Sequence, residues 1–228
     1  MPAETSHHTE TSWSLVLPVK VLAKAKTRLA AAAGPLREAL ALAVAADTVA
    51  AALRCPQVAE VIVVTDDPLA ASELSALGAH IVPDEPDQGL NPALAHGAAV
   101  ARRTRPEAGV GAMSADLPAL RPLELGRVLT AAAAFPESFV PDAADVGTTV
   151  YAARPGVPFS PAFGPDSRAR HAARGARELA LEGIDSVRRD VDTLDDLRAA
   201  LALGAGPRTA ALAARLPALS PEAGTSRG

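Results

Sequence analysis

Apolar positions recur along this chain with a strand period in some segments and a helix period in others. The segment 60–65, EVIVVT, is almost purely β-branched and is bounded by charges and by Asp66-Asp67-Pro68, which predicts a buried strand. Shorter apolar runs predict further strands at 13–19, 80–82, 110–116, 138–140, 147–153 and 185–191. Alanine- and leucine-rich segments predict helices at 35–53, 68–77, 92–103, 122–134, 193–203 and 208–216, and one that leads from FGPDSRARH to about 181.

The order of these elements predicts an α/β fold with a mostly parallel central sheet and helices on both faces, because parallel strands need crossover connections. The alternation breaks at 138–153, where two short strands joined by a loop are typical of an excursion that covers a ligand pocket. At 228 residues the chain fits one domain, expected at 13–217. The polar segments 1–12 and 218–228 are expected to be flexible tails.

Composition narrows the partners of this domain. Hydrophobic residues make up 49% of the chain but aromatic residues only 3%, so we expect a core of valine, leucine and alanine. The net charge of −4 argues against a surface that coats nucleic acid, which needs surplus lysine and arginine. The single cysteine, Cys55, excludes an internal disulfide and a cysteine-ligated zinc site. Since no membrane span or secretory signal is recognisable, we expect a cytoplasmic protein without membrane partners.

Cations crowd the segment directly after the first predicted strand. Lys20, Lys24, Lys26 and Arg28 occur there, where a mononucleotide-binding α/β fold has its phosphate loop. No glycine-rich phosphate motif is present, so cationic side chains would replace glycine amides. The alternative is a solvated basic helix face. The position after a strand favours phosphate binding, with Lys24 the least involved of the four.

Carboxylates follow two other predicted strands. Asp116 ends one run and precedes Leu117-Pro118, so it either stands at the carboxyl end of a strand or caps the next helix. Asp190 and Asp192 end the last predicted strand and would share one side of it. Together the three form an oxygen-only group suited to Mg²⁺, with helix capping as the alternative for Asp192.

A third candidate is the segment 163–167, FGPDS, which opens a helix rich in arginine. Backbone N–H groups, the Ser167 hydroxyl and nearby guanidinium groups would together bind an anion. An ordinary helix cap explains the same residues nearly as well. His171 in this helix is either a core or a surface histidine. The sequence offers no catalytic triad and no zinc pattern.

Six motifs link these candidates along the chain. They are LPVK with AKTRL (17–20 and 25–29), GLNPAL (89–94), SADLPAL (114–120), GTT (147–149), FGPDSRARH (163–171) and DVDTLDDL (190–197). In this order they resemble the phosphoenolpyruvate/2-phospho-L-lactate guanylyltransferases of coenzyme F-420 biosynthesis, members of the nucleotidyltransferase-like superfamily. The resemblance covers residues 15–201 and implies a nucleoside-diphosphate-sugar transferase-like, Rossmann-type sheet.

The resemblance also implies a role for each candidate residue. The catalytic group would be Lys20, Lys26, Arg28 and Asp116. The GTP-binding group would be Lys20, Lys26, Arg28, Gly89, Leu90 and Asn91. The metal group for Mg²⁺ would be Asp116, Asp190 and Asp192. The acceptor group would be Thr148, Thr149, Gly164 and Ser167, and which threonine faces the acceptor stays open because many relatives read Gly-Thr-Asn at 147–149.

The implied reaction joins GMP from GTP to the phosphate of phosphoenolpyruvate and releases pyrophosphate. The attacking phosphate oxygen is already ionised at neutral pH, so the reaction needs positioning and charge stabilisation rather than a general base. We expect phosphoenolpyruvate as the acceptor, because the Ala-, Arg- and Pro-rich composition and FGPDSRARH resemble the bacterial branch of the family.

Three alternatives stay open. One is a 2-phospho-L-lactate guanylyltransferase, since the two acceptors differ only at C2 and C3. Another is a molybdopterin or sugar-phosphate nucleotidyltransferase, which would need a glycine-rich first loop in place of Pro18-Val19-Lys20. The third is a catalytically silent nucleotide-binding regulator. Oligomeric state does not follow from these patterns, and a homodimer is kept as a hypothesis.

Overall fold

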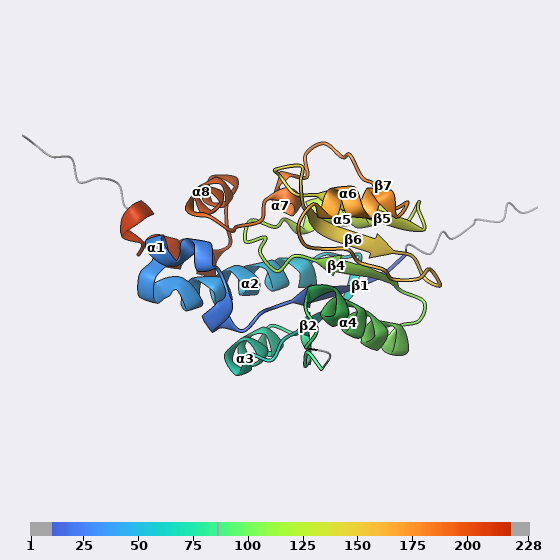
Figure 1. Ribbon diagram of the computed structural model, residues 1–228, viewed down its shortest axis with the longest axis horizontal. Coiled ribbons are helices and arrows are strands. Elements are labelled where there is room, and N and C mark those ends of the chain that lie inside the picture. The colour runs from blue at the N-terminus through green and yellow to red at the C-terminus, as the bar shows by residue number, and fades with distance from the viewer. Residues whose placement is uncertain (1–10, 86, 220–228) are drawn as a thin grey trace, which may run out of the picture.

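In the computed structural model, which describes residues 11–85 and 87–219, one seven-stranded sheet has the order β3-β2-β1-β4-β6-β5-β7 (Figure 1). Its strands are β1 (Trp13–Pro18), β2 (Val58–Val64), β3 (His80–Val82), β4 (Gly109–Met113), β5 (Glu137–Pro141), β6 (Thr148–Ala153) and β7 (Arg177–Glu178). β1 pairs in parallel with β2 and β4, and β2 with β3. β6 is antiparallel to β4 and β5, and β7 is parallel to β5. The predicted, mostly parallel sheet is confirmed.

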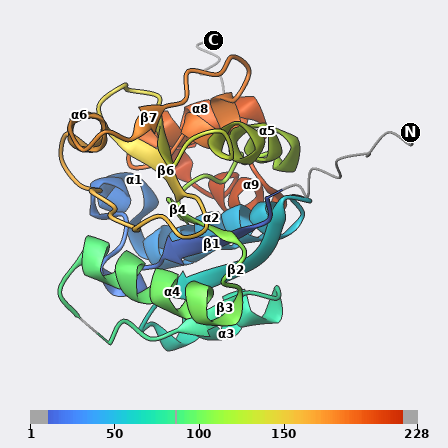
Figure 2. The same ribbon diagram turned by 90° about the vertical axis from the view of Figure 1, so that its right-hand side faces the viewer.

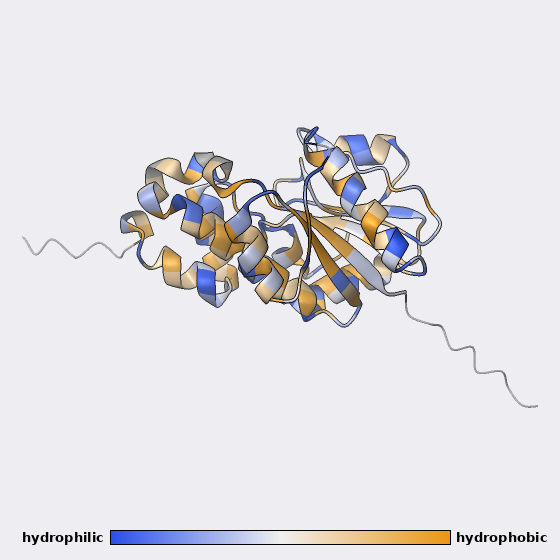
Figure 3. Ribbon diagram, turned by 90° about the horizontal axis from the view of Figure 1, so that it is seen from below, coloured by the Kyte–Doolittle hydropathy of each residue, from blue (hydrophilic) through white to orange (hydrophobic). Residues whose placement is uncertain are grey.

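Helices cover both faces of this sheet. The helices of the described residues are α1 (Ala30–Ala33), α2 (Arg37–Leu53), α3 (Pro68–Ala76), α4 (Leu90–Thr104), α5 (Pro122–Ala132), α6 (Ser167–Ala173), α7 (Asp185–Arg188), α8 (Leu194–Leu203) and α9 (Pro207–Ala213), with 3₁₀ turns at Leu22–Lys24, Thr27–Leu29, Gly34–Leu36 and Pro217–Leu219. Alternate side chains of a strand face opposite sides. Leu15 and Leu17 of β1 therefore pack with α2, α3 and α5, whereas Val16 packs with α4 (Figure 2). Hydrophobic residues accordingly concentrate in the central strands (Figure 3).

A smaller apolar cluster lies at the end of the molecule where Figure 1 shows α1 and α8 together. Leu40 of α2, Leu197 of α8 and the loop residue Val191 pack in this cluster. The Asp47 carboxylate on α2 accepts the Thr209 N–H at 2.7 Å and so fixes the start of α9. The cluster holds the segment before α8 close to the end of the sheet.

The predicted helix to about residue 181 is too long. α6 ends at Ala173 because Gly175 adopts the left-handed conformation, with a φ of 89°. The Ala176 N–H then donates to the His171 carbonyl at 3.2 Å, which satisfies the end of the helix. The chain continues into the short edge strand β7.

The strand predicted at 185–191 is wrong. Residues 185–188 form α7, which is docked on α5 because Glu124 accepts both the N–H and the hydroxyl of Ser186, at 2.9 and 2.8 Å. Val187 packs in the large cluster that also contains Leu15 and Leu17, whereas Val191 packs in the smaller cluster. The apolar residues of the segment 185–191 therefore pack in two separate clusters, whereas those of a strand would pack on one of its faces.

The remaining predicted strands and helices lie within about three residues of their predicted bounds. The predicted tails fall outside the described residues, apart from 11–12 and 218–219. Within the described part of the chain, no helix is both long and apolar enough to cross a membrane.

The close packing of α4 on the sheet can be tested at Gly97. A Cβ there would lie 2.5 Å from a Val16 methyl and 2.8 Å from a Val64 methyl, both in buried, stiff side chains. Gly97→Ala should therefore lower the free energy of unfolding by about 1–2 kcal/mol, measured by denaturant titration. In a Val16→Ala background the same substitution should cost less, because one of the two crowding side chains is gone. Helix propensity alone predicts the opposite sign, so a more stable variant would contradict this packing.

Candidate active site

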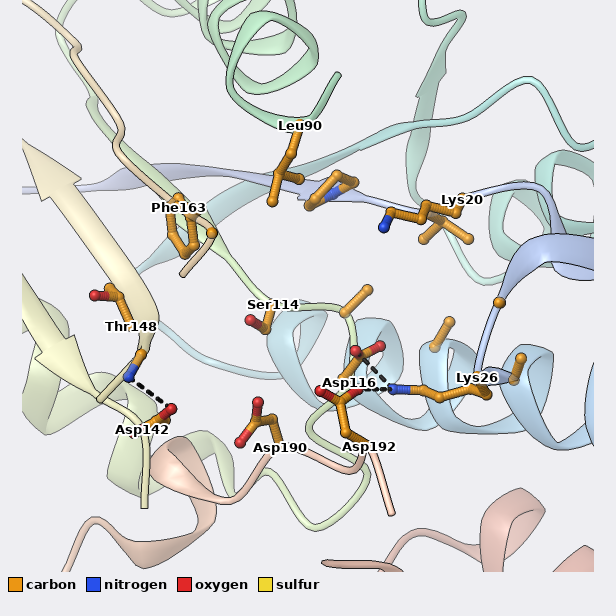
Figure 4. A pocket seen from close by; sticks show the side chains of 18 of the residues that line it. Lys20, Lys26, Leu90, Ser114, Asp116, Asp142, Thr148, Phe163, Asp190 and Asp192 are labelled. Carbon is orange, nitrogen blue, oxygen red and sulfur yellow. Dashed lines mark hydrogen bonds and ion pairs between the residues drawn. The ribbon is translucent and has the colours of Figure 1, made fainter. Parts of the chain in front are cut away.

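A cavity of about 460 Å³ opens where β1 and β4 end and β6 begins. Because β6 runs antiparallel to β4, its first residues lie beside the end of β4, and the Ser114 N–H donates to the Thr149 carbonyl at 2.8 Å. The polar residues that line the cavity are Lys20, Lys26, Arg28, Ser114, Asp116, Asp142, Thr148, Ser167, Asp190 and Asp192. Figure 4 shows Lys20 and Lys26 on one side and Thr148 and Asp142 on the other.

The basic segment after β1 forms two 3₁₀ turns that neighbouring side chains hold in place. Asp67 accepts the Leu22 N–H at 2.9 Å, and the Arg37 guanidinium donates to the carbonyls of Leu22, Ala23 and Ala25. Burial tends to raise the pKa of Asp67, but N–H donors, including that of Leu22, hold this pKa below its usual value. The sequence analysis missed both residues, although Asp67 precedes a proline at a helix start and so carries a capping signal.

Lys26 joins this segment to two others. Its backbone has a φ of 52°, and its side chain is only 5% exposed. The ammonium group lies 2.6 Å from an Asp116 carboxylate oxygen, donates to the Val191 carbonyl and lies 3.5 Å from Asp192 (Figure 4). Arg28 is largely exposed and lies 3.9 Å from Asp192. The cations and carboxylates predicted separately from the sequence therefore meet at one end of the cavity.

Asp190 and Asp192 reach the cavity from a loop, so the expectation that they share one side of a strand is wrong. The Val191 N–H donates to the Asp116 carbonyl at 3.0 Å, which ties this loop to the end of β4. Burial raises the pKa of Asp190 to about 6, helped by the negative charges of Asp192, Asp142 and Asp116. The carboxylates around Lys26 thus carry more negative charge than this one ammonium group neutralises.

These carboxylates fit a hard divalent cation. No group of three or more histidine, cysteine, aspartate or glutamate side chains in the described residues is arranged to enclose a metal by itself. Mg²⁺ commonly takes only one or two protein carboxylates and completes its shell with phosphate oxygens and water. Burial, and after it the neighbouring carboxylates, raises the pKa of Asp190. Such buried, clustered oxygen donors suit that ion when a phosphorylated substrate supplies the other ligands.

The opposite end of the cavity carries the predicted acceptor group. Thr148 lines the cavity, whereas Thr149 is fully buried away from it, as the alternation of a strand requires. Gly164 has a φ of 117° and lines the cavity with Ser167, the first residue of α6. Of the two threonines left open by the sequence, Thr148 therefore faces the cavity.

Asp142 also lines the cavity and was missed by the sequence analysis. Its carboxylate accepts the N–H groups of Val146 and Gly147 at 3.0 and 2.8 Å. A Cβ at Gly147 would lie 2.3 Å from this carboxylate, so the turn before Thr148 needs glycine there. This turn sets where β6 starts.

The three residues expected near the nucleoside differ in position. Leu90 lines the cavity, but Gly89 and Asn91 do not. The Asn91 amide accepts the Phe163 N–H at 2.8 Å and donates to the Phe163 carbonyl at 3.0 Å. Asn91 thus fastens the start of α4 to the loop that carries Gly164.

Comparison with known proteins supplies the family. The model of the MobA-like NTP transferase domain matches residues 35–192, which include the carboxylate and acceptor ends of the cavity. This chain belongs to the MobA-like NTP transferase family. Like other members, it is a nucleotidyltransferase.

Close relatives of this NTP transferase carry a more specific name. A phosphoenolpyruvate guanylyltransferase of Thermomonospora curvata is 81% identical over 228 residues, which is 100% of both chains. A phosphoenolpyruvate guanylyltransferase of Streptosporangium roseum is 63% identical over 216 residues, 95% of each chain.

Solved structures share the fold of this NTP transferase at low sequence identity. A CMP:2-keto-3-deoxy-manno-octonic acid synthetase complexed with CTP has a TM-score of 0.53 and 18% identity, covering 84% of this chain and 99% of its own. A manganese complex of Rv0371c from Mycobacterium tuberculosis has a TM-score of 0.50 and 23% identity, covering 84% and 98%. The nucleotidyltransferase-like fold expected from the sequence is confirmed.

The crowded carboxylates of this NTP transferase predict that Asp190→Asn stabilises the unliganded protein. Between pH 4 and 6 the folded protein binds a proton at Asp190 that the unfolded chain does not, so the ionised carboxylate costs stability above pH 6. At pH 7 the variant should be more stable by roughly 1–3 kcal/mol, and the difference should vanish near pH 4. Thermal unfolding from pH 4 to 8 measures this.

Asp195→Asn is the matched control, because that carboxylate is 88% exposed and forms an ion pair with Arg198 and with no other of the described residues. It should change little across the same pH range. An Asp190→Asn variant that is no more stable than the wild type at pH 7 would mean that the site tolerates its charge without cost.

Proposed function

We propose that this chain is a phosphoenolpyruvate guanylyltransferase, which joins GMP from GTP to phosphoenolpyruvate, releases pyrophosphate and serves coenzyme F-420 biosynthesis in the cytoplasm. The observation that carries the proposal is the single cavity in which Lys20, Lys26 and Arg28 stand beside Asp116 and the 190–192 carboxylates. Such a site binds two polyanions and a divalent cation together. The names of the relatives at 81% and 63% identity support the choice of substrates.

The two ends of the cavity suit the two substrates. The exposed cations Lys20 and Arg28 and the neighbouring Leu90 would hold the triphosphate and approach the nucleoside. Thr148, the Gly164 segment and Ser167 would hold the carboxylate and phosphate of the acceptor. Gly89 and Asn91 act in this proposal through the loop geometry rather than by contact with GTP.

The proposed reaction needs no proton transfer by the protein. A phosphate oxygen of phosphoenolpyruvate, ionised at pH 7, attacks the α-phosphorus of GTP and forms the new P–O bond. The bond from the α-phosphorus to the bridging oxygen breaks, and pyrophosphate leaves with both electrons. The protein brings the two anions together in line and stabilises the charge that develops on the transferred group and on pyrophosphate. Lys20, Lys26 and Arg28 supply that positive charge.

Asp116 and Asp190 would hold the divalent cation, proposed as Mg²⁺, with Asp192 beside them. When bound, this ion neutralises phosphate oxygens and orients them for displacement. The manganese complex of a structural neighbour supports a divalent ion in this fold. Asp192 contacts both Lys26 and Arg28, so its first role here is to hold the basic segment against the metal group.

The test is a matrix of four nucleoside triphosphates against phosphoenolpyruvate, 2-phospho-L-lactate and a sugar phosphate, with pyrophosphate release and product mass as readouts. We expect turnover with GTP and phosphoenolpyruvate. A tenfold or greater kcat/KM advantage for 2-phospho-L-lactate would overturn the acceptor alone. Preference for a sugar phosphate would favour the alternative transferase, and no pyrophosphate release with any pair would favour a silent regulator. Light scattering of the same sample decides whether the protein is the hypothesised homodimer.

Asp116→Asn should nearly abolish turnover while the protein stays folded. The change removes a charge from the metal group and from the contact with Lys26 but keeps the shape of the side chain. Loss of such transition-state electrostatics typically costs on the order of a hundredfold in kcat. Steady-state kinetics at saturating Mg²⁺, with a melting curve as the folding control, measure the effect. Turnover within a few-fold of the wild type would contradict the assignment of Asp116.

A further inference from the structure

One buried imidazole contacts every segment that carries the proposed acceptor group. His171 of α6 is 1% exposed, so it is a core histidine. Its Nδ1 lies 3.0 Å from Thr148 Oγ1, and its Nε2 accepts the Ala162 N–H at 2.9 Å. Ser167 begins the same helix, α6, that carries His171. Thr148 and Ser167 line the cavity themselves, and Ala162 precedes the loop residues that do.

Aromatic rings fix the plane of this imidazole. Tyr151 and Phe139 stack on it, with ring centroids 4.9 and 5.5 Å away, and Phe163 meets it edge-on at 5.4 Å. Burial, together with the positive charges of Arg174 and Arg170, lowers the pKa of His171 to about 4. The ring is therefore neutral at pH 7.

A neutral imidazole carries one N–H, and the surroundings determine which nitrogen has it. Because Nε2 accepts the Ala162 amide, the proton is on Nδ1. Nδ1 cannot then accept a hydrogen bond from Thr148, so the Thr148 oxygen accepts from the ring. No other hydrogen-bond partner of this hydroxyl is found among the described residues. The Thr148 proton is left free to donate into the cavity that Thr148 lines.

We propose that His171 is a positioning residue for the anionic acceptor: it orients the Thr148 hydroxyl as a donor toward a carboxylate or phosphate oxygen and holds the 162–167 segment around that oxygen. This inference rests on the proposed function, because it takes the acceptor to be the anion that Thr148 meets. His171 touches no substrate and takes no part in the transfer of the nucleotidyl group. Its effect is on acceptor binding.

His171→Phe tests the role, since phenylalanine keeps an aromatic ring in the stack but removes the hydrogen bonds. We expect the KM for phosphoenolpyruvate to rise about tenfold or more, because the Thr148 donor to a charged group is no longer held in its orientation and the 162–167 segment loses its hydrogen bond to the ring, while the KM for GTP stays within about twofold. His171→Asn retains an amide N–H near the position of Nδ1 and should recover most of the affinity for the acceptor. A histidine that only fills the core would change both KM values together or neither.

A double-mutant cycle shows whether His171 acts through Thr148. Thr148→Val should raise the KM for phosphoenolpyruvate by a similar factor, and adding His171→Phe should raise it little further. If the KM of the double variant rose by the product of the two single effects, the two residues would act independently and the proposal would be overturned. If His171→Phe does not fold, the cycle of His171→Asn with Thr148→Val replaces it, and the asparagine should then raise the KM for phosphoenolpyruvate above the wild-type value only when the Thr148 hydroxyl is present.

Tyr151→Phe is the matched control. It removes the hydrogen bonds of the Tyr151 hydroxyl, which donates to Glu137 and accepts the Ser160 N–H, but keeps the aromatic ring that stacks on His171. We expect a lower melting temperature and an unchanged KM for phosphoenolpyruvate. If the wild-type protein does not transfer GMP from GTP to phosphoenolpyruvate, the proposed function is wrong. If the wild type is active but the His171 variants have the same KM for phosphoenolpyruvate as the wild type, only the positioning role is wrong.

Discussion

The site depends on the contacts of the Lys26 ammonium group with three oxygen acceptors. Only 5% of this side chain is exposed, and the charge is held by oxygens of Asp116, Val191 and Asp192. These acceptors come from the end of β4 and from the loop before α8. Because a desolvated charge must be paired, this one group draws three distant segments into a single wall of the cavity. The cation is thus a structural tie and, in the proposed function, a source of positive charge for phosphate binding.

The carboxylates around this cation carry more negative charge than it neutralises. Burial raises the pKa of Asp190, and the negative charges of Asp192, Asp142 and Asp116 raise this pKa further. An unliganded protein pays for such crowding in stability, as functional sites often do. In the proposed function, the arrangement would become favourable when a divalent cation and phosphates bind together, so the electrostatics that weaken the unliganded fold would favour the loaded enzyme.

Side chains that do not face the cavity determine its shape. Asp67 and Arg37 hold the basic segment through backbone groups, so this loop reaches a defined conformation without the glycine-rich sequence of other phosphate loops. Asn91 fastens the loop of Gly164 to α4, and His171 joins that loop to Thr148 and α6. The donors and charges presented to the substrates are therefore only as well placed as these buried contacts make them.

Local chemistry in the sequence was sufficient to predict much of this protein. The β-branched run of β2, the helical repeats of α2 and α4, the cations after β1 and Asp116 after β4 all follow from burial periodicity or from position at a strand end. The same applies to Asp190, since a carboxylate run after apolar residues marks the edge of the core whether those residues form a strand or a loop.

What the tertiary structure decided depends on contacts between residues far apart in the chain. The run 185–191 contributes to two apolar clusters, so its pattern imitated a strand. The pairing of β6 with β4 decided that Thr148 and not Thr149 faces the cavity. His171 could be core or surface until Thr148 and Ala162 were brought to its two nitrogens. The sequence by itself determined most of the apolar core, the longer helices and the charged candidates, whereas the strand order and the packing of loops decided which of them meet, because those contacts have no local pattern.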